Sequence, residues 1–474
     1  MEPISVPLPW LARENVYIGI DIGKRGHVAG LLSATLLRQH RRFEACPTFP
    51  FAESRAGFSA LLAELLTYTT RARLCVLVEH TGHYHRPLVE FLQDEGIAVY
   101  LIHAQARHSQ ILKSDSRDAL ALANLLYNQV EKEVQVSDAR ATARLLAQPS
   151  AAAVFLRALM RHREDLSADL VRRKNQLRAI TDELFPEFAE CFKDPTGSSA
   201  RIVRRRYPTG DALAAAAPAA VAEVASQLPA SVRPKLSRLA AMAAASIGSR
   251  DPERRRALLL EERQLLDELD LLSAHLSALD AEIATALDGS REGAILQSLP
   301  MIGPTAAATL LSAIGHVSAF KSAAQLKSYL GWAPRRTQTG TTTDRMALSR
   351  GGLRSSRRVL YLITINAVRM DTEWKALYER LVPKKCRYDE RTKRYRGKMK
   401  VIGRVAGQII ELIYMLLMRD ADTVAHTPEG QAPPPPLLYD RAIHRQHRAG
   451  GYVPARPATP SPPKASIRRI GPIP

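Results

Sequence analysis

The chain has 474 residues, with 67 Lys and Arg against 47 Asp and Glu, a formal net charge of +20 and a sequence pI near 10.0. This length can form two or three domains, and the charge favours a polyanionic partner, nucleic acid ahead of a membrane surface. No run of about 18 apolar residues marks a membrane span, no secretory signal is seen, and four scattered cysteines argue against a disulfide framework or structural zinc. We expect a cytoplasmic protein that makes no membrane contact.

Residues 12–145 are predicted to form an α/β domain. Apolar runs predict buried strands at 16–22, 74–79 and 97–103. Apolar residues at helical spacing predict helices at 57–69, 85–96 and 116–128. Strands that alternate with helices in this way are typical of an α/β fold.

Residues 150–290 contain two long amphipathic patterns, at 150–190 and 252–288, in which apolar residues recur every three or four positions between charged ones. An Ala- and Pro-rich insert at about 208–247 separates them. The pattern favours a coiled-coil arm with an elaborated tip, and a helical bundle core is the alternative.

Residues 291–420 are predicted to form a second, mostly helical domain. The stretch 298–315 has the form of a helix–hairpin–helix, with its turn at Pro300 and Gly303 and its second helix starting at Thr305. Backbone N–H groups at such a turn can hold a phosphate, so Gly303 and Thr305 are predicted nucleic-acid contacts. A plain helical hairpin is the alternative.

The segment 421–474 is rich in Pro and basic residues, and we expect it to be disordered.

Four carboxylates stand at the ends of predicted elements: Asp21 and Glu79 at strand ends, and Asp115 and Asp118 at the start of a helix. If they converge at one edge of a sheet, they can hold two divalent cations about 3.5–4 Å apart for phosphoryl transfer. Oxygen ligands suit Mg²⁺, with Mn²⁺ as the alternative. Taken alone, Asp115 is better read as a helix N-cap, since the stretch SDSRDA is full of capping residues.

Residues 331–360 read as a polar, hydroxyl-rich loop that enters a basic helix. Its arginines are predicted to line a phosphate path: Arg335, Arg336, Arg345, Arg350, Arg354, Arg357 and Arg358. A hydroxyl flanked by guanidinium groups is suited to attack a phosphodiester, because those groups stabilise the developing charge. A polar loop without chemistry is the alternative.

Residues 382–404 mix Lys and Arg with two tyrosines, Tyr388 and Tyr395. The cations, including Lys384, Lys385 and Arg394, are predicted to neutralise phosphates, and the tyrosines can stack on unpaired bases. The alternative is a solvated charge run.

The stretches "IGIDIGK", "VEHTGHYHRPLVEFL" and "KSDSRDALALA" resemble the acidic DEDD domain of a family of bacterial insertion-sequence transposases that includes the Piv DNA invertase. The stretch from "LPMIGPTAAATLL" to "RRTQTGTTTDRMALSRGGLRSSRR" is similar to the family's C-terminal transposase domain. The resemblance covers most of 16–145 and 290–420 but neither the insert nor the tail. It implies a RuvC-like, ribonuclease H-like fold for the first domain.

The resemblance also implies a recombinase in which a serine followed by glycine forms a covalent link to DNA. Thr339 occupies that position here, a departure from the family, and Ser349 is the alternative nucleophile. The implied partners are target and donor double-stranded DNA, a noncoding bridge RNA, and further copies of the chain, as dimers that assemble into a tetramer. The alternatives are a magnesium-dependent, junction-resolvase-like nuclease and a nucleic-acid-binding protein without chemistry.

Overall fold

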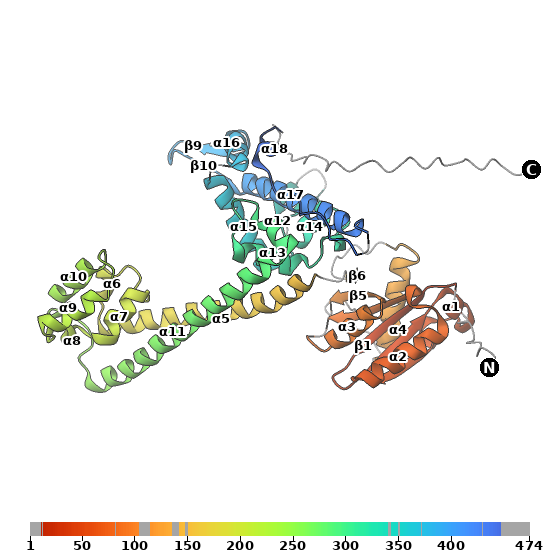
Figure 1. Cartoon of the computed structure of the whole chain (residues 1–474), viewed down its shortest axis with the longest axis horizontal. Helices are drawn as coiled ribbons and strands as arrows, with labels where there is room; N and C mark the ends of the chain where they lie inside the picture. Colours follow the sequence, from red (N-terminus) through yellow and green to blue (C-terminus); the bar gives the residue numbers. More distant parts are fainter. Residues whose placement is uncertain are drawn as a thin grey trace, which may run out of the picture. The chain divides into compact units, whose positions relative to one another are not determined.

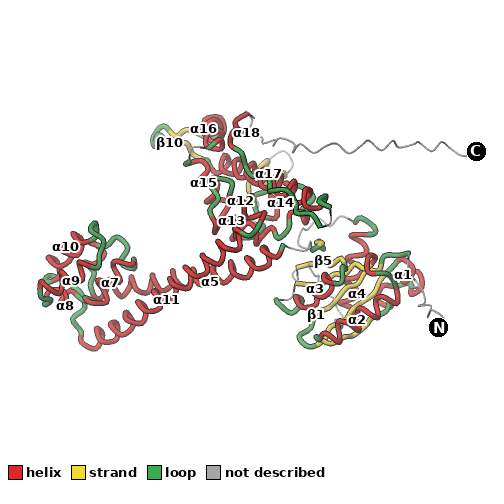
Figure 2. Tube along the Cα trace, in the orientation of Figure 1, coloured by secondary structure: helices red, strands yellow, loops and turns green. Residues whose placement is uncertain are grey.

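The computed structural model describes residues 11, 13–80, 82–103, 114–134, 142–146, 150–339, 343–348, 351–370, 372–428 and 430–446 (Figure 1). The chain divides into two compact units, Met1–Pro149 and Ser150–Pro474. The first is a mixed α/β unit and the second is almost entirely helical, as the distribution of strands and helices in Figure 2 shows. Buried apolar side chains form separate clusters in the two units.

One mixed sheet organises the first unit, with strand order β3-β2-β1-β4-β5-β6. The strands are β1 (Val16–Ile22), β2 (Gly26–Leu32), β3 (Thr48–Ala52), β4 (Leu74–His80), β5 (Ala98–His103) and β6 (Arg144–Leu145). β1, β2 and β3 are antiparallel neighbours, β4 and β5 run parallel to β1, and β6 is antiparallel to β5. The predicted strands are present, whereas β2 and β3 were not predicted because glycine, histidine and proline interrupt their apolar pattern.

Helices cover both faces of this sheet. They are α1 (Ala34–His40), α2 (Arg55–Tyr68), α3 (Arg86–Asp94) and α4 (Asp115–Val130). α4 lies against β1 and β2, where a Cβ on Gly19 or Gly30 would collide with the helix backbone near Ala119 and Leu120. Phe58 of α2 packs near His27, whose position in β2 alternates with Gly30, so α2 covers the opposite face.

In the second unit, the long helices α5 (Ala151–Leu184) and α11 (Pro252–Asp288) lie side by side, as Figure 1 shows. They share a buried apolar seam that includes Leu177 and Leu265. Arginine–carboxylate pairs cross between them, such as Arg163 with Asp280. The structure describes a helix pair over 151–288, where the sequence indicated two amphipathic helices.

The Ala- and Pro-rich insert is folded. Its segment contributes α6 (Phe188–Cys191), α7 (Ser198–Arg206), α8 (Gly210–Ala214), α9 (Pro218–Ser226) and α10 (Arg233–Ala243). These helices gather around their own apolar cluster, to which Phe188 and Leu239 belong. The prolines begin α9 and α10 at the first helical turns, where a missing N–H costs nothing.

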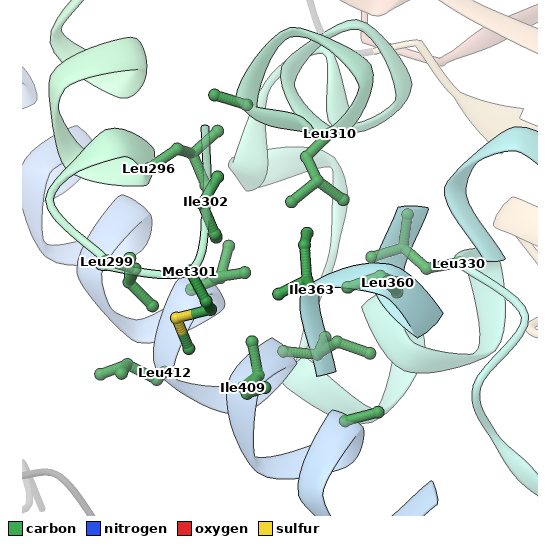
Figure 3. Close-up of a cluster of buried hydrophobic side chains, with 14 of the residues drawn as sticks. Leu296, Leu299, Met301, Ile302, Leu310, Leu330, Leu360, Ile363, Ile409 and Leu412 are labelled. Atoms are coloured by element: carbon green, nitrogen blue, oxygen red, sulfur yellow. The ribbon is translucent and has the colours of Figure 1, made fainter. Parts of the chain in front are cut away.

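The remaining helices form one body: α12 (Arg291–Gln297), α13 (Pro304–Ile314), α14 (Ala323–Tyr329), α15 (Arg354–Arg369), α16 (Glu373–Lys385), α17 (Met399–Ala425) and α18 (Arg441–Gln446). Figure 3 shows its core, where Leu296 and Ile302 face Ile409 of α17 and Ile363 of α15. Two hairpins that the sequence did not predict join this body: β7 (Pro334–Thr339) with β8 (Thr343–Leu348), and β9 (Arg387–Asp389) with β10 (Arg394–Arg396).

α17 is the core helix of this body. By length and composition it meets the criteria for a membrane span, but 61% of its most apolar window is buried inside the protein. Its buried residues, such as Ile409 and Leu416, belong to the common apolar cluster. Core helices of soluble proteins show the same pattern.

The prediction of disorder from residue 421 is wrong for the part of that segment that the structure describes. α17 continues to Ala425, and residues 430–446, here called the C-terminal strap, pack on the helical body. Tyr439 stacks on the buried Trp374 at 5.6 Å between ring centroids. The many prolines of this segment predicted that it would not fold against a core. The aromatic and basic residues that follow the prolines, however, contact residues of α16. Residues 447–474 lie outside the described residues.

Candidate active site

Asp21 and Glu79 occupy adjacent positions at one end of the sheet. β1 and β4 are parallel, with Ile20 opposite Val78, so the next position on each strand is a carboxylate. Residues opposite each other on parallel strands point to the same face. Asp21 is half-buried, and Glu79 is 7% exposed. Both therefore lie on one face of the sheet, which is the face covered by α4.

α4 brings Asp118 to this face. Tyr17, two residues before Gly19 in β1, meets Tyr127 near the end of α4, at 5.4 Å between ring centroids. Gly19 itself lies against Ala119 near the helix start. The helix therefore runs antiparallel to β1, and its first turn lies toward Asp21.

The two helix carboxylates differ in environment. Asp118 is only 5% exposed, whereas Asp115, the first residue of α4, is exposed. The alternative reading of Asp115 as the N-cap is wrong, because Ser114 caps the helix with its side chain accepting from the N–H of Arg117. Asp115 instead places its charge in the first turn, where the helix dipole favours a carboxylate.

The donor chemistry of this face fits a hard divalent cation. Asp21, Glu79 and Asp118 supply only carboxylate oxygens, the ligands that Mg²⁺ and Mn²⁺ prefer. Across the part of the chain that is described, however, no three His, Cys, Asp or Glu side chains are grouped closely enough to hold one ion. The strand register and α4 thus place three of the predicted residues on one face of the sheet, and the four-carboxylate metal site itself stays a prediction.

His27 locks the turn that follows Asp21, and the sequence analysis missed it. Its imidazole is buried, Nδ1 accepts from the N–H of Gly23 at 3.2 Å, and Nε2 bonds to the carboxylate of Glu53. The N–H of Glu53 donates to the carbonyl of Arg25 in the same turn. A histidine between Gly26 and Val28 carries no sequence signal for this role, because its partner Glu53 lies 26 residues away.

Thr339 is the last residue of β7 and pairs with Thr343 across the β7–β8 hairpin. The segment expected to be a loop thus forms a hairpin over its described residues, in which Pro334–Thr339 pairs antiparallel with Thr343–Leu348. Ser349 and Arg350 lie outside the described residues, as do the side chains of Thr339, Arg335, Arg336 and Arg345. The nucleophile assignment therefore stays a prediction.

Two glycines are in close backbone contact at the base of this hairpin. Gly331 and Gly352 have φ of 78° and 85°, and a Cβ on Gly352 would approach the Cα of Gly331 to 2.5 Å. Arg357 donates from Nη2 to the carbonyl of Gly351. Arg357 therefore contacts the backbone at the hairpin base, whereas Arg354 and Arg358 on the same helix are exposed.

The remaining predicted contacts are accessible to different degrees. α13 begins at Pro304, one residue before the predicted start, because proline suits the first helical position. Gly303 is exposed at its N-cap, and Thr305 is half-buried. Lys384, Lys385 and Arg394 are exposed, whereas Tyr395 is half-buried and packs on the apolar core.

Comparison with known proteins gives two family matches. Residues 18–186 match a family model described as a DEDD transposase of the IS110 type, and residues 293–379 match the transposase IS116/IS110/IS902 family. The chain is 25% identical over 421 residues to the uncharacterised 43.6-kDa protein of insertion element IS110 from Streptomyces coelicolor, which covers 85% of this chain and 94% of that protein.

Two further relatives are similar over shorter spans. The mini-circle putative transposase for IS117 from Streptomyces coelicolor is 27% identical, over 69% of this chain and 78% of its own length. The uncharacterised 44.8-kDa protein of insertion element IS116 from Streptomyces clavuligerus is 26% identical, over 47% of this chain and 55% of its own length. The two family matches together span more than half of the chain, in the order and positions of its acidic and hairpin-bearing regions. The chain therefore belongs to the IS110 family of DEDD transposases and is a DNA transposase/recombinase.

Proposed function

We propose that this transposase moves an insertion sequence by metal-assisted cleavage and exchange of DNA strands, with the hydroxyl of Thr339 as the nucleophile. The observation that carries the proposal is the register of β1 with β4 under α4, which gathers the positions of Asp21, Glu79 and Asp118 on one face. The strand order and directions of the sheet also support a ribonuclease H-like, RuvC-like nuclease domain.

Asp21, Glu79 and Asp118, together with Asp115 in the same first turn of α4 as Asp118, would hold Mg²⁺ or Mn²⁺. A bound divalent cation supplies Lewis-acid stabilisation of charge on the phosphoryl oxygens. In the proposed step, Thr339 Oγ1 loses its proton and bonds to phosphorus, and a deoxyribose oxygen leaves and takes up a proton. The Cβ of threonine carries a methyl group that serine lacks, and this group restricts rotation of the side chain. We therefore expect slower attack than in serine-bearing relatives.

The proposed partners follow from charge and family resemblance. A net charge of +20 suits a protein that holds target and donor DNA together with a bridge RNA. Base pairing with the RNA would choose the sites, while the protein would contact backbone and shape; RNA-guided nucleases are an analogy for this division. We further propose a dimer that assembles into a tetramer, with the carboxylates of one subunit acting with the hydroxyl hairpin of another.

A covalent adduct tests the nucleophile. The full chain, its RNA and DNA that carries the element's ends are incubated with Mg²⁺ and resolved on a denaturing gel. The wild-type chain and Thr339→Ser should form a protein–DNA adduct, and Thr339→Ala should form none. An adduct that persists in Thr339→Ala contradicts the assignment of Thr339. Full cleavage without any adduct in every variant instead supports the alternative of a structure-specific nuclease.

Metal binding can be measured without catalysis. Added Mg²⁺ should raise the Tm of the wild-type chain, because a ligand that binds only the folded state stabilises it. Asp21→Asn should lose this shift, and Asp94→Asn, which removes an exposed carboxylate on α3, should keep it. Equal shifts in both variants would contradict a site at Asp21.

RNA guidance is tested by co-purification. The chain is expressed in cells that carry the DNA flanking the element, and the bound RNA is sequenced. One discrete noncoding RNA is expected, whereas recovery of random fragments alone would contradict guidance.

A further inference from the structure

The hairpin β9–β10 and its flanking helix ends carry a dense group of exposed cations. We call residues 384–400 the basic hairpin. Its exposed cationic residues are Lys384, Lys385, Arg387, Arg391, Lys393, Arg394, Arg396, Lys398 and Lys400. Against these nine stand only two carboxylates, Asp389 and Glu390. So many positive charges on a short segment repel one another, and binding to a polyanion neutralises them.

The basic hairpin is held in one shape. Asp389 Oδ1 accepts from the N–H groups of Arg391 and Thr392, and Asp389 Oδ2 pairs with Arg396 at 2.5 Å. Lys393 completes the turn with φ of 49°. One carboxylate is thus used to shape the tip, which reduces the entropy that the tip must lose when it binds a partner.

The two tyrosines of the hairpin have different roles. Tyr388 and Tyr395 are opposite each other across β9 and β10, with ring centroids 5.0 Å apart in an edge-on arrangement. Tyr395 is half-buried and packs against the apolar core of the helical body. Tyr388 is 48% exposed. Tyr395 therefore anchors the hairpin, and Tyr388 is the ring that a ligand can reach.

We propose that the basic hairpin binds an unpaired nucleic-acid strand, with Tyr388 stacked on a base and the surrounding cations on the phosphates. An exposed tyrosine amid cations is the combination that single-strand sites use, because every unpaired base offers a π-face. In duplex DNA these faces are covered by the neighbouring base pairs, so binding to a duplex would need the cations but not the exposed tyrosine. The segment follows the matched transposase region, which ends at residue 379.

A membrane surface is a less suitable partner. The apolar helix that follows, α17, packs most of its apolar residues into the protein core, with 61% of its most apolar window buried, so they are committed to the fold and not to a bilayer. This inference rests on the proposed function only for the origin of the unpaired strand, which is either bridge RNA or DNA that is unpaired during strand exchange. The test therefore uses both kinds of strand.

The experiment measures binding by the full chain with Asp21→Asn, so that no cleavage is needed. Fluorescence anisotropy compares a labelled single-stranded RNA, a single-stranded DNA of the same sequence and its duplex, all in one salt concentration. The variants are Tyr388→Ala and Tyr388→Phe. The matched control is Tyr361→Ala, which removes another exposed tyrosine, 39% exposed, from α15.

Tyr388→Ala should weaken single-strand binding about 5- to 150-fold, since stacking on one aromatic ring is worth about 1–3 kcal/mol per base. Tyr388→Phe should stay within about twofold, and duplex binding should change little. Lys393→Gln should lower the slope of log K against log salt by about 0.7 for a single strand. Lys235→Gln, an exposed lysine of α10, is the control and should not change it.

Three results would overturn the proposal: unchanged single-strand binding in Tyr388→Ala, an equal loss in Tyr361→Ala, or equal weakening for the duplex. Stronger binding to vesicles of anionic lipid than to either strand would also overturn it, in favour of a membrane surface. A stronger effect with RNA points to the guide, and one with DNA points to the exchanging strand. The adduct assay at Thr339 does not depend on Tyr388, so the failure of one proposal is distinguishable from the failure of the other.

Discussion

Gly19 shows how one residue controls the placement of the carboxylates. A Cβ here would overlap the carbonyl oxygen of Ala119 and the N–H of Ala123, both helix backbone atoms that cannot move separately. Only glycine therefore lets α4 lie close enough to β1 for Asp118 to reach the face of Asp21.

Gly19→Ala should destabilise the first unit by about 1–3 kcal/mol or more, as overpacking does in cores. Gly26→Ala is the matched control, because its Cβ would meet only the carbonyl of Phe51 at 3.4 Å. Thermal unfolding followed by circular dichroism measures both. Equal stability of the two variants would show that α4 is not constrained at Gly19.

His27 makes a second prediction at this scale. His27→Ala removes an acceptor for the Gly23 N–H and a partner for Glu53, and leaves a cavity beside Phe51. We expect a loss of about 2–4 kcal/mol, within the range for a disrupted buried network. His27→Gln, which can accept and donate at similar reach, should recover part of the loss. Hydrogen exchange of the Gly23 amide gives the local readout, and unchanged protection there would contradict the role of His27.

At the scale of elements, one buried ion pair joins α7 to α11. Arg204 Nε donates to Glu262 at 2.6 Å, and Arg204 also contacts Thr181 and the ring of Phe188. Burial raises the pKa of Glu262 and lowers that of Arg204, in each case against the pull of the partner charge. Burial therefore disfavours the charged form of each side chain, and the charge of the partner offsets part of that penalty.

Arg204→Met should therefore cost about 3–5 kcal/mol, because it leaves the Glu262 carboxylate buried without its cation. The double variant Arg204→Met with Glu262→Leu should recover most of that loss, since apolar pairs often replace buried ion pairs at little cost. Urea unfolding compares the three chains. A double variant as unstable as the single one would mean that the pair itself, rather than charge compensation, stabilises the junction.

The C-terminal strap is the second element-scale feature. Its Arg441 and Arg445 donate to Glu373 at 3.3 and 2.9 Å, beside the stack of Tyr439 on Trp374. Burial opposes ionisation of Glu373, but these hydrogen bonds outweigh it and lower the pKa of that carboxyl below its ordinary 4.5.

A carboxyl with a lowered folded-state pKa stabilises the fold above its unfolded pKa and loses that contribution as pH falls through the folded value. The strap should therefore hold above about pH 4.5 and loosen below it, with Trp374 fluorescence shifting to the red. Glu373→Gln should remove this acid transition. Tyr439→Ala should cost about 1–3 kcal/mol and expose Trp374 at neutral pH. Leu438→Ala, at an exposed neighbouring position, is the control and should leave the emission unchanged.

At the scale of the whole molecule, the two units have separate apolar cores, one around the sheet and others among the helices. We expect scanning calorimetry to resolve more than one transition, because separate cores need not unfold together. Gly19→Ala should lower one transition and Tyr439→Ala another. A single transition that both variants shift equally would contradict independent unfolding.

Local sequence patterns were sufficient to predict many of the helices and strands of this protein and its family. Apolar runs located β1, β4 and β5, helical periodicity located α4, α5 and α11, and the acidic and hydroxyl motifs pointed to the transposase family before any fold was known. These features depend on residues within a few positions of each other, so the chain specifies them without reference to distant contacts.

Tertiary structure decided which of those residues meet. The pairing of Ile20 with Val78 aligns Asp21 with Glu79, and no local pattern encodes a register between strands that are more than 50 residues apart. The same holds for His27 with Glu53 and for the strap on Trp374. Such contacts form only when segments far apart in the sequence close into loops and pack against each other. The sequence alone therefore indicated candidate reactive side chains, and the tertiary structure determined which residues lie beside them.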